Sequence, residues 1–231
     1  MTTLTFEPHD RVLVIRMANG IPNAIGPSLV NDLSAALQNL PEDCRGVVLA
    51  GNTKFFSMGL DLPSLISMDR HAMLNFFTKF HRMAFDLYTL PCPTIAAING
   101  HAVAGGCVMA LLCDFRFAGS DSLKFGLNEV RLGVPVPYLA DLVLRQIAGD
   151  RTATRMLFDG GFITMATGFT TGLVDQIFSS ETVEKEAIKG IARIGAFPKD
   201  AIATHKGNRI EEVKDRFLRN VTEKKIGRAH V

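Results

Sequence analysis

The sequence contains no tryptophan, only two tyrosines and only four cysteines among its 231 residues. The cysteines (Cys44, Cys92, Cys107 and Cys113) lack the C-x-x-C spacing of a zinc or redox site, and they are too few for a disulfide-built domain. We therefore expect four buried, reduced thiols. The six histidines have no metal-ligand spacing either, so the sequence predicts no metal site.

Long apolar runs and a strong charge of either sign are also missing. No stretch approaches the roughly 18 uninterrupted apolar residues of a membrane span, and the N-terminus MTTLTFEPHD lacks the basic and apolar parts of a secretion signal. We therefore expect a cytoplasmic protein without a membrane partner. The net charge is only +2, and basic residues do not alternate with aromatic ones, so we expect no nucleic-acid partner.

Short apolar runs alternate with segments of helical periodicity, which predicts an α/β fold. We expect strands at residues 12–17, 47–50, 94–98, 115–118 and 123–126. We expect helices at residues 27–40, 73–90, 138–148, 152–158, 183–194, 198–205 and 210–221. The continuous apolar runs at 47–50 and 94–98 are typical of strands buried on both faces.

Two loops carry the strongest chemical signal. Residues 55–62 (FFSMGLDL) and 99–107 (NGHAVAGGC) contain small residues that let the backbone approach a ligand closely. A helix that begins in the second loop adds unpaired N–H groups and the positive end of a dipole. Two backbone donors aimed into one cavity make a site for a developing oxyanion.

These loops belong to a series of blocks in fixed order. The blocks are GVVLAG (46–51), PTIAAING (93–100), AGGCVMALLCDFRFA (104–118), FGLNEVRLGVPVP (125–137) and GLVDQIF (172–178). Together they resemble the crotonase, or enoyl-CoA hydratase/isomerase, superfamily over most of the chain. The resemblance implies a spiral of ββα units in residues 1–178 and a C-terminal helical trimerisation region in residues 179–231. It also implies an acyl-CoA thioester substrate, a homotrimer or hexamer, and no cofactor besides the coenzyme A of the substrate.

The resemblance also assigns roles to single residues. The backbone N–H groups of Leu60 and Gly105 correspond to the two oxyanion donors of the family. Glu129 corresponds to the acid/base, and Asn128 to a residue that contacts the substrate. The resemblance also implies that five consecutive residues line the path of the pantetheine and adenine groups: Met58, Gly59, Leu60, Asp61 and Leu62.

The number of carboxylates separates the reactions of this family. Hydratases that resemble this chain hold a water between two glutamates, one of which follows the GGC cysteine. Here Val108 follows Cys107, and only Glu129 remains. A single carboxylate can take a proton from C2 of a 3-enoyl thioester and return it to C4, and an apolar wall of Val108, Leu127 and Val134 would raise its pKa. The LNE sequence at 127–129, with LGVPVP after it, resembles the Δ3,Δ2-enoyl-CoA isomerase branch most.

Two alternatives stay open. A hydratase or another acyl-CoA enzyme would use Glu129 with a second polar group, for example Tyr138. A non-catalytic relative would bind acyl-CoA, or RNA through the basic segment 206–231. Outside the loops, we expect Asp114 and Arg116 to form a structural pair and His101 to be a turn residue.

Overall fold

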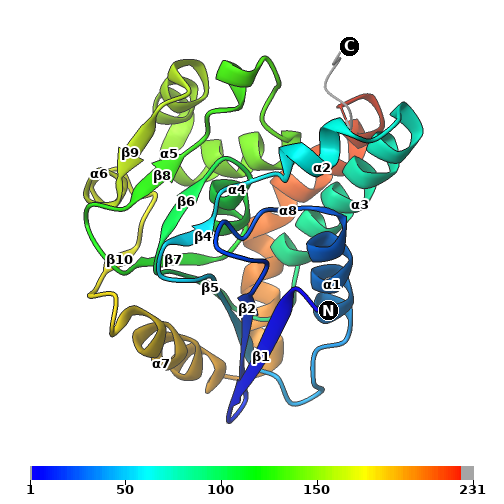
Figure 1. Cartoon of the computed structure of the whole chain (residues 1–231). Coiled ribbons are helices and arrows are strands. Elements are labelled where there is room, and N and C mark those ends of the chain that lie inside the picture. Colours follow the sequence, from blue (N-terminus) through cyan, green and yellow to red (C-terminus); the bar gives the residue numbers. More distant parts are fainter. Residues whose placement is uncertain (1, 225–231) are drawn as a thin grey trace.

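The computed structural model describes residues 2–224, which form two β-sheets with helices around them (Figure 1). The strands are β1 (Leu4–His9), β2 (Val12–Met17), β3 (Gly46–Ala50), β4 (Phe55–Ser57), β5 (Thr94–Ile98), β6 (His101–Val103), β7 (Phe115–Ala118), β8 (Lys124–Gly126), β9 (Phe162–Thr164) and β10 (Gln176–Ile177). The larger sheet has the order β1-β2-β3-β5-β7-β10, and the smaller sheet has the order β4-β6-β8-β9. The predicted α/β class is confirmed.

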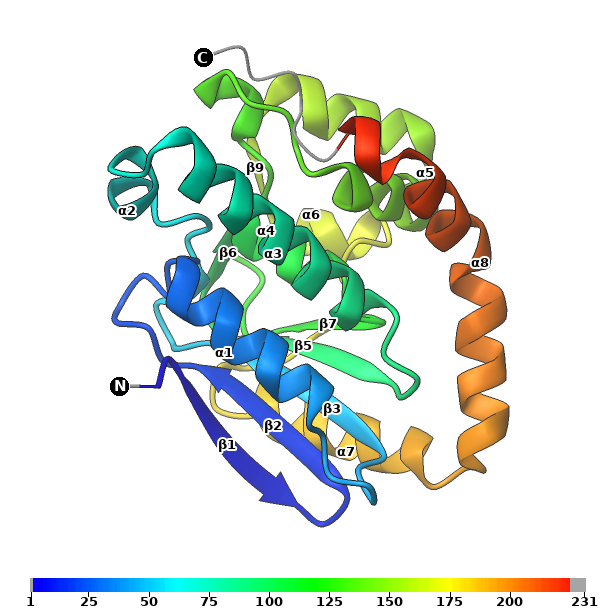
Figure 2. The same ribbon diagram turned by 90° about the vertical axis from the view of Figure 1, so that its right-hand side faces the viewer.

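The helices surround these sheets on several sides. They are α1 (Pro27–Gln38), α2 (Leu62–Ile66), α3 (Arg70–Tyr88), α4 (Gly105–Leu111), the 3-10 turn η1 (Glu129–Leu132), α5 (Tyr138–Asp159), α6 (Met165–Thr170), α7 (Val183–Gly195) and α8 (Lys199–Lys224). Figure 2 shows α1 and α3 side by side on one face of the larger sheet, with α7 on the other face. From the end of α7, α8 runs along the molecule to α5.

The chain crosses from the larger sheet to the smaller sheet three times in the same way. β3 leads to β4 and then α2 and α3, β5 leads to β6 and then α4, and β7 leads to β8 and then η1 and α5. The strands β3, β5 and β7 are parallel to one another, as are β4, β6 and β8. The spiral of ββα units implied by the motifs is therefore present.

Burial on both faces explains the apolar strands of the larger sheet. In β5, Ile95 and Ala97 pack against α7, whereas Ala96 and Ile98 belong to the main core on the opposite face. All five residues of β5 are buried. Successive side chains of a strand point to opposite faces, so a strand covered twice needs apolar residues at every position.

The structure differs from the sequence prediction at the C-terminal helices and in the two loops. Residues 198–205 and 210–221, predicted as separate helices, form the single helix α8. Lys206 lies within the predicted break, where its buried Nζ donates to the carbonyl of Cys92 at 2.9 Å and to Asp114 at 2.7 Å, which holds this interval against the sheet. The predicted loops 55–62 and 99–107 contain the three-residue strands β4 and β6, which the small residues of these segments do not indicate.

The other predicted helices and strands are present within a few residues of the expected bounds. The two helices predicted at 138–148 and 152–158 are the two halves of α5, which meet at the non-helical Gly149 (φ 75°). Residues 225–231, the end of the predicted C-terminal region and of the basic segment 206–231, lie outside the described residues. The division at residue 178 stays a prediction. In residues 2–224, none of the helices has the length and apolarity needed to cross a membrane.

Candidate active site

Three parallel strands of the smaller sheet bring the predicted site segments together. Ser57 of β4 pairs with Ala102 of β6, and Val103 of β6 pairs with Gly126 of β8. Because the carboxyl ends of parallel strands meet at one edge, residues 58–62, 104–105 and 127–129 all leave the sheet at the same edge. The two loops and the LNE segment therefore meet, as the motifs implied.

The first two segments are in direct contact through their glycines. A Cβ atom on Gly59 would lie 2.8 Å from the backbone nitrogen of Gly105, and a Cβ atom on Gly105 would lie 3.2 Å from the Cα atom of Gly59. Gly59 also has a φ of +96°, which side chains resist. The loops approach each other this closely only because both positions lack a side chain.

A single bridge fixes the direction of the Leu60 amide. The N–H of Ile25 donates to the carbonyl of Gly59 at 2.7 Å, and the N–H of Asp61 donates to the carbonyl of Ile25 at 3.1 Å. In this parallel arrangement the N–H of the intervening Leu60 points away from Ile25. Sequence reasoning missed Ile25, because one bridging residue leaves no periodic signal.

Both predicted donors are available. Within residues 2–224, neither the N–H of Leu60 nor that of Gly105 donates a hydrogen bond to the protein. Gly105 is the first residue of α4, where the first N–H groups have no intrahelical acceptor. Helix α4 is buried throughout. Only glycine fits at position 106, because a Cβ atom there would lie 2.1 Å from the carbonyl oxygen of Ser57.

Glu129 follows β8 at the start of η1 and is only 7% exposed. Its Oε2 atom has no hydrogen-bond partner in the described part of the chain. Burial raises the pKa of this carboxyl from 4.5 to about 7, and the backbone amides of Glu129 and Asn128 oppose the shift in part. No other titratable side chain among residues 2–221 contributes to it. An unpaired, buried carboxyl with such a pKa is a candidate general base.

The surroundings of Glu129 are largely apolar. Burial raises the pKa of the Cys107 thiol, and the negative charge of the Glu129 carboxylate raises it further. Glu129 therefore lies close enough to the first turn of α4 to interact electrostatically with it. Val108 and Leu127 are each 1% exposed, as a closed wall requires. Val134 is 41% exposed, and its N–H donates to the carbonyl of Glu129 at 3.2 Å, so its place in that wall stays a prediction.

The remaining predicted binding residues surround this edge of the sheet. The side-chain Oδ1 of Asn128 is buried and has no hydrogen-bond partner within the described residues. The carboxylate of Asp61 accepts from the Ser64 N–H and caps α2. Because its side chain is used in this cap, Asp61 would contact a ligand through its backbone. Met58 and Leu62 are 46% and 42% exposed and present apolar surface beside the loop.

Other polar residues have structural partners. The expected pair of Asp114 and Arg116 is wrong as an ion pair, because the Arg116 guanidinium donates to the backbone carbonyl of Asp114 at 3.4 Å and not to its carboxylate. Asp114 pairs with Lys206 and Arg209 of α8, whereas Arg116 pairs with Asp175 at 2.8 Å. These contacts fasten α8 and the segment before β10 to the larger sheet.

His101 and Tyr138 also have contacts away from the proposed chemistry. His101, expected in a turn, is instead the first residue of β6, and its Nδ1 atom accepts from the Lys124 N–H at 3.0 Å, which joins β6 to β8. The ring of Tyr138 stacks on Phe217 of α8, with ring centroids 6.3 Å apart.

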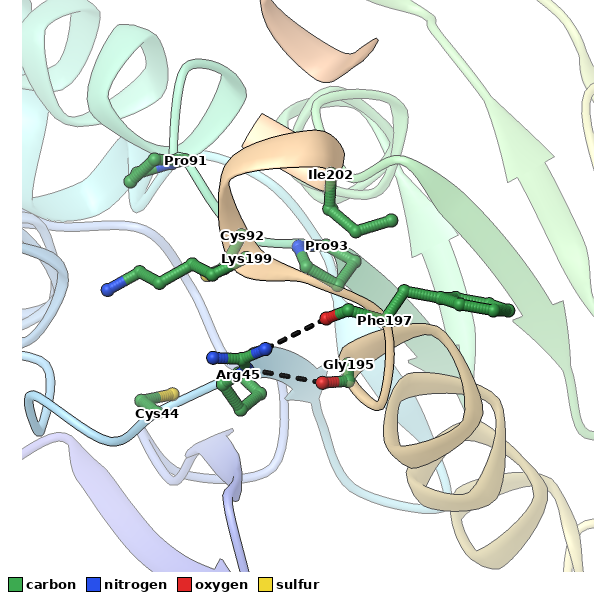
Figure 3. Close-up of a pocket in the computed structure, with 9 residues that line it drawn as sticks. All are labelled: Cys44, Arg45, Pro91, Cys92, Pro93, Gly195, Phe197, Lys199 and Ile202. Atoms are coloured by element: carbon green, nitrogen blue, oxygen red, sulfur yellow. Dashed lines mark hydrogen bonds between the residues drawn. The ribbon is translucent and has the colours of Figure 1, made fainter. Parts of the chain in front are cut away.

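Two cavities lie outside the three site segments. The first cavity has a volume of only about 10 Å³ and lies at the amino ends of β3 and β5. There Arg45 donates to the carbonyls of Gly195 and Phe197, at 3.1 and 2.8 Å (Figure 3). Its contacts join the sheet to the connection between α7 and α8. A groove of about 190 Å³ lies between α1 and α3 and begins at Pro27, two residues after Ile25. In residues 2–224 no three histidine, cysteine or acidic side chains gather as a metal site would require.

Comparison with known proteins identifies the family of this chain. The family model described as enoyl-CoA hydratase/isomerase matches residues 7–226. Human mitochondrial enoyl-CoA delta isomerase 1 is 31% identical over 194 residues, which are 82% of this chain and 64% of the human protein. The chain thus matches slightly less than two thirds of that relative's length. The 2,3-dehydroadipyl-CoA hydratase of Escherichia coli is 32% identical over 82% of this chain and 74% of its own length.

The fold comparison gives the same family. The crystal structure of human mitochondrial Δ3-Δ2-enoyl-CoA isomerase superimposes with a TM-score of 0.91 at 28% identity, covering 96% of this chain and 89% of the human one. The relatives include isomerases and hydratases, so the comparisons identify the family and not the reaction. The chain belongs to the enoyl-CoA hydratase/isomerase family.

Proposed function

We propose that this protein is a Δ3,Δ2-enoyl-CoA isomerase, which moves the double bond of a 3-enoyl-CoA into conjugation with the thioester. The observation that carries the proposal is Glu129, a buried carboxyl that, within the described residues, has an unpartnered oxygen and no second acid acting on its pKa. It lies at the sheet edge where the free amides of Leu60 and Gly105 meet.

The two amides stabilise the intermediate. Removal of a proton from C2 places negative charge mainly on the thioester oxygen, and the Leu60 and Gly105 N–H groups donate to that oxygen. A preorganised donor of this kind contributes about 3 kcal/mol to the transition state. The dipole of α4 adds positive potential at the same end.

Glu129 moves the proton. Its carboxylate takes a proton from C2, the C3–C4 double bond shifts to C2–C3 as the charge spreads to C4, and the same carboxyl returns the proton to C4. Atoms and charge balance without water, metal or redox partner. A pKa near 7 suits a group that must both accept and donate the proton.

The environment disfavours hydration. Water addition needs an acid or base that orients water opposite Glu129, and the buried Val108 at the position after Cys107 can neither donate nor accept a hydrogen bond. Tyr138, the alternative partner considered from sequence, has its ring stacked on α8.

The substrate contacts are part of the proposal. Asn128 would satisfy its orphaned Oδ1 on the substrate, and residues 58–62 would line the coenzyme A path. The assembly into a homotrimer or hexamer through the C-terminal helices and a cytoplasmic location stay predictions.

An absorbance assay tests the reaction. With a 3-enoyl-CoA, the purified protein should form the conjugated thioester, which absorbs in the ultraviolet, whereas a 2-enoyl-CoA should not lose that absorbance through hydration. Glu129→Gln should lower the isomerisation rate about a hundredfold or more, because it removes the base. Glu42→Gln, at an exposed position, is the matched control and should leave the rate unchanged. A near-normal rate in Glu129→Gln, or faster hydration than isomerisation, would overturn the proposal.

A further inference from the structure

The 3-10 turn that begins with Glu129 is tied to the end of α5 by one side chain. The Nε and Nη2 atoms of Arg131 both donate to the carbonyl oxygen of Asp159, at 3.2 and 3.1 Å. Asp159 is the last residue of α5, where carbonyl groups lack intrahelical partners and carry the negative end of the helix dipole. The guanidinium therefore joins two elements that are 28 residues apart in sequence.

The next residue, Gly160, supplies the surface on which the turn packs. A Cβ atom on Gly160 would lie 2.6 Å from Cγ1 of Val130 and 3.1 Å from Cγ of Arg131. A Cβ atom on Gly126, where the chain leaves β8, would likewise lie 2.7 Å from the carbonyl oxygen of Gly161. The Gly160–Gly161 connection thus touches the residue before the LNE segment and the turn after it.

The side chain of Glu129 has little else to fix it. Its Oε2 atom has no hydrogen-bond partner among the described residues, so the direction of the carboxyl depends on the backbone of the turn. A displacement of about 1 Å in a reacting group can lower a rate about a hundredfold. Contacts that hold the turn therefore have a direct effect on a base in this position.

On the basis of the proposed function, we propose that Arg131 and Gly160 are positioning residues for Glu129. Arg131 fastens the turn to the carbonyl of Asp159, and the bare Cα of Gly160 leaves the space that Val130 occupies. Neither residue touches the substrate in this role.

A purely structural role makes a different prediction. If Arg131 only stabilises the end of α5, its loss lowers the melting temperature and leaves the kinetics of the folded enzyme unchanged. If it positions the base, its loss lowers kcat, leaves KM nearly unchanged and alters the pH profile.

The glycine is tested against a glycine with similar backbone strain. Gly160 and Gly172 have φ values of +56° and +75°, but no atom lies within 4 Å of a Cβ atom on Gly172. We expect Gly160→Ala to lower kcat about tenfold or more, with KM for a 3-enoyl-CoA within about twofold of normal. Gly172→Ala should retain normal kcat. Adding Val130→Ala to Gly160→Ala removes the overlapping methyl group and should restore most of the lost activity.

The arginine is tested against a neighbour at the same helix end. Arg155, on the last turns of α5, has an 85% exposed side chain and contacts the Asp159 carboxylate at 3.7 Å. We expect kcat to fall in the order wild type, Arg131→Lys, Arg131→Met, because lysine keeps the charge but not the paired N–H donors. Arg155→Met should behave as wild type.

A titration that needs no turnover completes the test. Carbon-13 NMR of the side-chain carboxyl groups, with Glu129→Gln used to identify the Glu129 signal, should give a midpoint near pH 7 in the wild type and a lower one in Arg131→Met. If the wild type does not isomerise 3-enoyl-CoA but this midpoint shifts, the proposed function fails and the positioning role stands. If the wild type isomerises and the Gly160 and Arg131 variants keep normal kcat and the same midpoint, the positioning role is overturned.

Discussion

At the scale of single residues, the candidate site combines one buried acid with two positions that lack side chains. Gly59 and Gly105 allow the backbones of two loops to touch, and Glu129 is buried at the same edge of the smaller sheet, where its Oε2 has no partner among the described residues. A buried carboxyl is expensive to ionise, so the proton-accepting form of Glu129 reduces stability. Function and stability therefore oppose each other at this residue.

The raised pKa of Glu129 predicts a pH-dependent stability difference. Between pH 4.5 and about 7 the folded protein keeps this proton while the unfolded chain loses it, so the free energy of unfolding falls as the pH rises. The full effect is about 3 kcal/mol above pH 7. Urea unfolding should therefore show that Glu129→Gln gains stability over the wild type at pH 8 but not at pH 4. An equal gain at both pH values would contradict this.

The same pKa predicts the pH dependence of the rate. Glu129 must be ionised to accept the C2 proton, so kcat/KM should fall about tenfold per pH unit below pH 7. A pH–rate profile of isomerisation, recorded at pH values where the protein remains folded, tests this. An acid limb centred near pH 4.5 would mean that Glu129 is solvated in the working enzyme or is not the base.

At the scale of elements, the smaller sheet depends on a close contact between α4 and β4. A Cβ atom on Gly106 would lie 2.1 Å from the carbonyl oxygen of Ser57, which is backbone and cannot rotate away. The first turn of α4 therefore lies directly on the strand that precedes the Leu60 loop. Any side chain at Gly106 must push the two loops apart.

Two glycine substitutions test this contact. Gly106→Ala should lower the free energy of unfolding by about 3 kcal/mol through overpacking. Gly207→Ala, inside α8 where a Cβ atom would meet no other part of the described chain within 4 Å, should instead raise it by about 0.5–1 kcal/mol, because alanine favours a helix more than glycine does. Thermal unfolding of both variants provides the measurement, and equal changes in both would contradict the close contact.

The sequence predicts the apolar strands and the amphipathic helices but not every short strand. The apolar run Thr94–Ile98 and the leucines of α1 correctly predict a strand and a helix. The strands β4 and β6 lie inside segments whose small residues predict loops, so the sequence pattern does not show them. At the site, motif order predicted which segments meet, but the Ile25 bridge, the Arg131 contact and the exposure of Val134 depend on tertiary packing.

At the scale of the whole molecule, α8 joins parts that are distant in sequence. Lys206 and Asp114 form a buried ion pair at 2.7 Å, with side chains 6% and 10% exposed, and Arg209 contacts the same carboxylate. Further along α8, Phe217 stacks with Phe85 of α3 and Tyr138 of α5. The helix thus connects the larger sheet to the helices around the site.

Breaking this pair should destabilise the whole protein. Asp114→Ala leaves the Lys206 ammonium buried without its carboxylate and should lower the free energy of unfolding by about 3 kcal/mol or more. Arg209→Met removes a 40% exposed partner and should have an effect of about 1 kcal/mol or less. Chemical denaturation measures both, and similar effects would show that Lys206 finds another partner.

The most direct measurement of the central claim follows one hydrogen. A 3-enoyl-CoA carrying deuterium at C2 is converted in ordinary water, and the position of the label in the conjugated product is read by NMR. A single carboxyl that is itself only 7% exposed should carry part of the deuterium from C2 to C4. Product with no deuterium at C4, or 3-hydroxyacyl-CoA as the main product, would contradict the account.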